Sequence, residues 1–165
     1  MDGAVQDAIN EQIRNELYSG YVYLAMSAHF EERNLTGFAH WMRLQAQEEL
    51  GHGMRLFDYL LDRGGHVVLE GIDQPPTDDW GTSLEIFQHA LEHEREVTRM
   101  IDALYELARD KRDNATQVAL QWFITEQVEE EASADAAVDQ LRRAGDNAAA
   151  LLMLDQKFGA RSDAD

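Results

Sequence analysis

The chain contains no cysteine among its 165 residues. Disulfides, thiolate zinc sites, iron–sulfur ligation and a cysteine nucleophile are therefore all excluded. No apolar run approaches the roughly 20 residues that a membrane-spanning helix needs, and no apolar block with a cleavage site stands at the N-terminus. The expectation is a soluble protein located in the cytoplasm.

Basic residues are also scarce. The chain has 14 Lys and Arg against 32 Asp and Glu, which gives a formal net charge of −18. Such a surface repels nucleic acids and anionic membranes, and it attracts cations. The sequence therefore predicts cations as partners and no nucleic acid or membrane as a partner.

Proline is the third scarcity, because the chain has only two, adjacent at Pro75 and Pro76. They lie in one stretch that begins at Gly64, so the rest of the chain has few helix breakers. The apolar periodicity predicts an all-α fold with four long helices and a short fifth, at about residues 5–33, 36–63, 82–111, 114–144 and 146–158. We expect one domain over 1–165, with a bundle over about 5–144 and a disordered tail at 161–165.

Three helix starts carry N-capping residue types. Thr36, Thr82 and Asn114 each stand just before an apolar periodic segment, and Thr82 forms a capping-box pattern with Glu85. These residues predict where the second, third and fourth helices begin.

The segment 64–81 determines how the helices are joined. Its eighteen residues span up to roughly 60 Å, whereas a helix of about 28 residues is only about 42 Å long. The segment is therefore predicted to run the height of the bundle, which makes the second and third helices parallel. Its apolar residues Val67, Val68 and Leu69 need cover, which an intersubunit contact would supply.

Each long helix carries a glutamate in its inward-facing apolar seam, traced in steps of three and four residues. These residues are Glu16, Glu49, Glu94 and Glu130, and His52 follows Glu49 by one turn. The turns between paired helices are expected near residues 35 and 112. Glu16 and Glu49 lie 19 and 14 residues from the first turn, and Glu94 and Glu130 each lie 18 residues from the second. At 1.5 Å per residue the four levels differ by at most about 7 Å. They are therefore predicted to meet near the middle of the bundle.

A single glutamate in an apolar seam usually either makes the fold more specific or lies on the surface because the helix phase has been misjudged. Four unpaired carboxylates together would cost several kcal/mol each, and the seams offer no Lys or Arg as a partner. Two divalent cations would balance the four charges. Carboxylates with one imidazole suit iron or manganese better than zinc or copper, although spacing alone leaves zinc and calcium open.

The sequence resembles the bacterial non-haem ferritins along nearly its whole length. The resemblance is carried by NELYSGYVYL at 15–24, QEELGH at 47–52, HERE at 93–96 and QWFITEQVEEE at 121–131. It implies a ferritin-like four-helix bundle with a long crossover and a short fifth C-terminal helix. It also implies an intra-subunit di-iron ferroxidase centre.

By position in the family motifs, Glu16, Glu49 and His52 would hold the first iron. Glu49, Glu94 and Glu130 would hold the second, so Glu49 would bridge the two.

The resemblance assigns further residues around this pair. Gln127 would lie against the site and Tyr23 would be a nearby redox-active tyrosine. A third, weaker iron site would use Glu48, Glu126 and Glu129 and would share one ligand with the second iron. No haem is expected, because Leu50 stands where the related bacterioferritins place a haem-ligating methionine.

As a ferritin, the chain would build a hollow shell of twenty-four subunits, oxidise Fe(II) with dioxygen or peroxide, and store Fe(III) as a mineral. The helix at 146–158 would form the fourfold contact. Two other functions stay open, namely a di-iron oxidase acting on an organic substrate and a passive metal buffer. The remaining histidines fall outside the seams and are expected at the surface or at subunit contacts: His29, His40, His66, His89 and His93.

Overall fold

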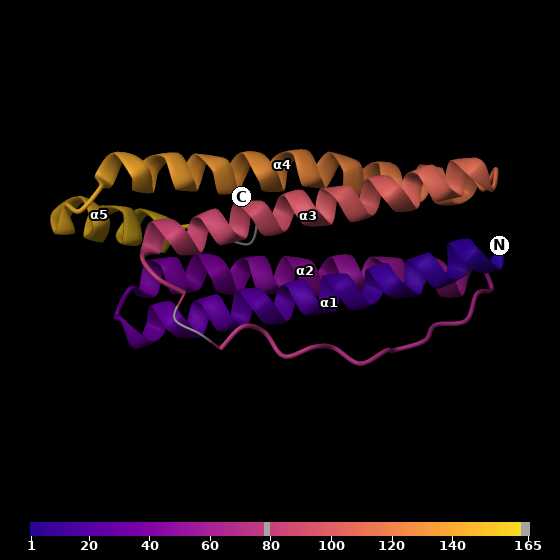
Figure 1. The fold of residues 1–165 in the computed structure, drawn as a ribbon, viewed down its shortest axis with the longest axis horizontal. Coiled ribbons are helices and arrows are strands. Elements are labelled where there is room, and N and C mark those ends of the chain that lie inside the picture. Colours follow the sequence, from indigo (N-terminus) through magenta and orange to yellow (C-terminus); the bar gives the residue numbers. More distant parts are fainter. Residues whose placement is uncertain (78–79, 163–165) are drawn as a thin grey trace.

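A computed structural model describes residues 1–77 and 80–162. These residues form five helices, shown in Figure 1. The helices are α1 (Gly3–Glu32), α2 (Thr36–Asp62), α3 (Ser83–Asp110), α4 (Asn114–Ala144) and α5 (Ala148–Phe158). Each boundary lies within two residues of the one that the sequence predicts. The all-α fold is confirmed, and none of the described helices is long and apolar enough to cross a membrane.

The long helices pack as two antiparallel hairpins, α1 with α2 and α3 with α4, and α1 also contacts α3. The predicted crossover is confirmed, because the chain after α2 returns along the outside of α1 before α3 begins (Figure 1). Asn10 of α1 holds this crossover at two points, donating to the carbonyl of His66 at 3.0 Å and accepting from the amide of Val68 at 2.8 Å. α2 and α3 are therefore parallel.

Two of the predicted capping residues need correction. The Thr82–Glu85 capping box is present, as expected. At α4 the N-cap is Asp113 instead of Asn114, and its carboxylate accepts from the amide of Thr116 at 3.2 Å. A carboxylate there also faces the positive end of the helix dipole.

The start of α2 is capped from across the chain. Thr36 is the first residue of α2, and its predicted capping role is wrong, because the N-cap position is Leu35 and makes no side-chain hydrogen bond. Instead, Asp155 of α5 accepts from the amide of Phe38 at 2.8 Å. A Cβ on Gly37 would lie 1.7 Å from the carbonyl oxygen of Asp155, so only glycine permits this approach. α5 is thereby attached to the end of the bundle.

The core consists of two apolar clusters stacked along the bundle. The cluster nearer α5 is rich in aromatic side chains, including Phe30, Phe38 and Phe87. The cluster nearer the N-terminus is mainly aliphatic and includes Ile9 and Leu60. A layer of buried polar side chains separates them.

Candidate metal centre

The four seam glutamates lie in the polar layer between the two apolar clusters. In each helix the glutamate is flanked by a buried residue of one cluster and a buried residue of the other. These flanking pairs are Ile13 and Tyr23, Ala46 and Leu56, Leu91 and Val97, and Phe123 and Ala134. Apolar packing above and below therefore fixes the height at which the carboxylates meet.

These carboxylates are almost completely removed from solvent. Glu16, Glu49 and Glu94 are 0% exposed and Glu130 is 8% exposed. His52 is 5% exposed, one turn along α2 from Glu49. The inward phase predicted for all five residues is confirmed.

Ligand atoms converge at two places within the described residues. Glu16, Glu49 and His52 each bring one ligand atom within 4.8 Å of the other two. His52 Nδ1 lies 3.6 Å from Glu49 Oε2 and 3.9 Å from Glu16 Oε2. His52, Glu126 and Glu130 form a second such group. This geometry suits cations bound by several carboxylates and one imidazole.

Glu49 differs from its neighbours in having no donor. One oxygen of Glu16 accepts from Gln12 Nε2 at 2.8 Å, and one oxygen of Glu130 accepts from Gln45 Nε2 at 2.8 Å. Neither oxygen of Glu49 receives a hydrogen bond from any described residue. An unpartnered buried carboxylate is costly, so either a bound cation or a proton would stabilise Glu49.

Burial changes the acidity of these groups. It raises the pKa of Glu94 to about 7 and the pKa of Glu130 to about 7, and repulsion from neighbouring carboxylates adds to the effect. Burial likewise raises the pKa of Glu49 well above its usual value, helped by the charges of Glu94 and Glu16. In the absence of a cation, protons therefore neutralise part of the centre, and a bound cation replaces them.

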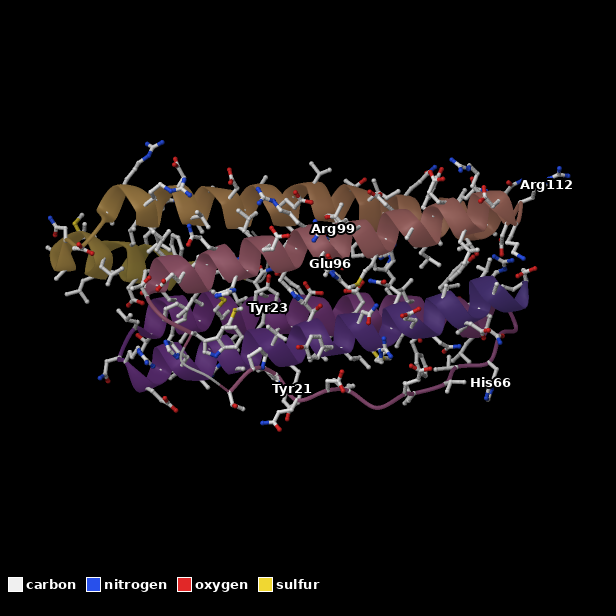
Figure 2. All side chains as sticks on the ribbon, in the orientation of Figure 1. Tyr21, Tyr23, His66, Glu96, Arg99 and Arg112 are labelled. Carbon is white, nitrogen blue, oxygen red and sulfur yellow. The ribbon has the colours of Figure 1, made fainter. Side chains whose placement is uncertain are left out.

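Tyr23 and Gln127 both contact Glu94. Tyr23 points into the bundle interior from α1, whereas Tyr21 points outward from the same helix (Figure 2). The hydroxyl of Tyr23 donates to Glu94 Oε1, and burial raises the pKa of Tyr23 well above 10. Gln127 Nε2 donates to Glu94 Oε2 at 3.2 Å and to the Glu94 carbonyl at 3.2 Å. Both residues thus hold one carboxylate in place.

The residues predicted for a third iron lie further out. Glu126 is half-buried and belongs to the second convergent group, whereas Glu129 is exposed. Glu48 is half-buried and forms an ion pair with Arg161 at 2.9 Å. Neither Glu48 nor Glu129 takes part in the two convergent groups of described residues.

Several neighbours of the centre were not singled out from the sequence. Gln45 falls on the inward seam of α2, one turn before Glu49. This position in the apolar pattern is enough to predict that Gln45 is buried near the centre. Arg161 falls within the predicted disordered tail, but its side chain is only 15% exposed and contacts Glu48. Residues 163–165 of that predicted tail lie outside the described residues. His29, expected at the surface or at a subunit contact, is buried in the subunit at 8% exposure.

Comparison with known proteins agrees with this geometry. Residues 6–144 match the family model described as a ferritin-like domain. The chain is 48% identical over 157 residues to a bacterial non-heme ferritin of Bacteroides fragilis, covering 95% of this chain and 97% of that protein. It is 39% identical over 155 residues to the bacterial non-heme ferritin of Staphylococcus epidermidis, covering 94% and 93%.

Solved structures show the same relationship. The open-pore ferritin of Archaeoglobus fulgidus superimposes with a TM-score of 0.96 at 44% identity, covering 98% of this chain and 99% of that one. An engineered closed form of that ferritin gives a TM-score of 0.96 at 46% identity, covering 98% of both chains. The match spans the bundle, the crossover and α5, and the chain belongs to the ferritin family.

Proposed function

We propose that this chain is a ferroxidase and iron-storage protein, which oxidises Fe(II) to Fe(III) at the buried centre and retains it as a ferric mineral. The observation that carries the proposal is the layer of four buried glutamates with one histidine, in which neither oxygen of Glu49 accepts a hydrogen bond from a described residue. Because no Lys or Arg of the described residues forms an ion pair with these four glutamates, the cations come from solution.

Two irons fit the charge and the arrangement of the layer. Glu16, Glu49 and His52 bind the first iron, and Glu49, Glu94 and Glu130 bind the second. Two Fe(II) ions carry a charge of +4, which balances four ionised glutamates. With so few protein ligands, each ion keeps positions open for water or oxidant, as redox chemistry requires.

Oxidation then takes one electron from each iron. The two electrons reduce one dioxygen, which takes up two protons and becomes hydrogen peroxide. If peroxide is the oxidant, two electrons and two protons convert it into two waters. Tyr23 and Gln127 keep Glu94 oriented throughout, because both donate to it.

A third iron binds more weakly beside the pair. Its ligands are Glu126, Glu129 and Glu48, with Glu130 shared. The burial of these side chains supports this role, since Glu130 is buried, Glu126 is half-buried and Glu129 is exposed to solvent.

Storage requires assembly, and we assign the chain to a shell of twenty-four subunits, each a single domain. Apolar side chains on the crossover and on α5 support assembly, because they lack cover within the subunit: Leu69 is 68% exposed, Val68 45%, Leu152 60% and Met153 72%. A cytoplasmic location stays a prediction from composition.

The test is to add about two Fe(II) per chain to metal-free protein in air, following oxidation by absorbance and particle size by chromatography. A ferroxidase shell predicts fast oxidation that saturates near that ratio on a very large particle. Slow oxidation without saturation would indicate a metal buffer. Fast oxidation on a small particle would indicate a di-iron oxidase.

A further inference from the structure

Arg161, three residues after the end of α5, lies beside the metal centre. Arg161 Nη2 donates to both oxygens of Glu48, at 3.0 and 2.9 Å. Its Nη1 donates to Gln45 Oε1, and its guanidinium lies 5.1 Å from the centre of the Trp41 ring. The Arg161 carbonyl is 3.0 Å from His40 Nε2. This arginine is therefore held by main-chain and side-chain contacts.

Gln45 carries the contact of Arg161 inward. Because its Oε1 accepts from Arg161, its amide nitrogen faces the centre, where it donates to Glu130 Oε2 at 2.8 Å. Gln45 is 0% exposed, so water cannot replace either partner easily. The chain of contacts runs from Arg161 through Gln45 to one oxygen of Glu130.

We propose that Arg161 is a positioning residue that closes the third iron position. Its guanidinium pairs with Glu48 where a third cation would need that carboxylate, and through Gln45 it holds one oxygen of Glu130. A guanidinium keeps its positive charge at all physiological pH values, so this counterion is permanent. The inference rests on the proposed function, because a third position has meaning only beside the ferroxidase pair.

The closure has a direct consequence for metal binding. With Arg161 in place, a third iron must displace an ion pair and its hydrogen bonds. Without it, Glu48 is free to bind, and Gln45 is free to release Glu130. The number of tightly bound irons is therefore set by Arg161, which lies after α5.

The test counts Fe(II) bound to metal-free protein under anaerobic conditions, by equilibrium dialysis, so that no turnover is needed. The wild type is expected to bind two ions tightly and a third weakly. Arg161→Ala is expected to bind the third ion about twofold to fivefold more tightly, the range for loss of a partly exposed ion pair. Arg161→Lys, which retains the charge, should fall between the two.

Two further variants serve as controls. Lys157→Ala removes a positive charge from the end of α5, where Lys157 donates to Gln140 at 2.7 Å and not to the centre. Its third-ion affinity should equal that of the wild type. In Arg161→Ala combined with Glu48→Gln the gain should disappear, because Glu48 is the ligand that Arg161 occupies.

Equal third-ion affinity in the wild type and Arg161→Ala would overturn the proposal, as would an equal gain in Lys157→Ala. Persistence of the gain in the double variant would also overturn it. If Arg161→Ala fails to fold, Arg161→Lys decides, and wild-type affinity in that variant contradicts the closure. A wild type that binds fewer than two ions would instead refute the proposed two-iron function.

Discussion

Two polar networks in this bundle differ in how their charges are balanced. Near the end of α2, Arg63 donates to both oxygens of Asp113, at 3.0 and 3.2 Å. Tyr59 and Thr116 complete that network through a 2.8 Å contact between their hydroxyl oxygens. In the central layer, the carboxylate of Glu49 has no such partner within the part of the chain that the structure describes.

The pKa values express the same difference. The hydrogen bonds that Arg63 donates to Asp113 raise the pKa of Arg63, so the pair is held in its charged form. In the centre, burial raises the pKa of Glu94 and that of Glu130 to about 7, so the charged form is disfavoured. A charged group that is paired within the chain, such as Asp113 with Arg63, stabilises the fold. An unpaired buried carboxylate, such as Glu49, instead favours binding of a proton or a cation.

The first prediction removes the unpartnered carboxylate. Glu49→Ala is expected to slow initial Fe(II) oxidation about 1,000-fold, equal to about 4 kcal/mol, because both irons lose a shared ligand. Stopped-flow absorbance measures the rate. Unfolding temperature and particle size should not fall, since the substitution also removes a buried carboxyl group that has no hydrogen-bond partner among the described residues. A full initial rate in this variant would refute the shared-ligand assignment.

The second prediction breaks the completed network. Asp113→Ala is expected to lower the free energy of unfolding by about 2 to 3 kcal/mol, because Arg63 loses its partner and α4 loses its N-cap. Urea unfolding of the metal-free protein measures the loss. Iron oxidation per folded chain should match the wild type, and a large loss of oxidation would show that the two networks are not separate.

The sequence was sufficient for the central layer because periodicity in steps of three and four identifies buried positions. Glu16, Glu49, Glu94 and Glu130 all stand among apolar residues in that pattern, and a local capping box marked Thr82 correctly. These features depend on residues close together in the chain.

Contacts between distant parts of the chain could not be predicted in this way. Asp155 caps a helix that begins more than a hundred residues earlier, and Arg161 reaches Glu48 from a segment without periodicity. Nothing local in the sequence signals either contact, because both depend on where α5 packs.

The third prediction concerns pH. Glu94 and Glu130 titrate near 7 in the folded protein, against a usual value of 4.5. Between pH 4.5 and 7 the folded state therefore binds more protons than the unfolded state, so stability falls as pH rises. We expect the metal-free protein to lose about 2 kcal/mol across this window, after allowance for relaxation and water penetration.

Calorimetry at several pH values measures this loss, and two comparisons sharpen it. Glu94→Gln should show a shallower fall, because its side chain does not ionise. Bound divalent cations should also reduce the fall, because they balance the ionised carboxylates. Stability that rises from pH 4.5 to 7 in the metal-free protein would contradict the unpaired state of the central layer.

The most direct test of the central claim is anomalous diffraction at the iron edge from crystals soaked anaerobically with Fe(II). The account predicts two strong peaks per subunit, about 3.5 to 4 Å apart, with Glu49 between them. Peaks confined to the exposed acidic surface, with none inside the layer of buried glutamates, would contradict it.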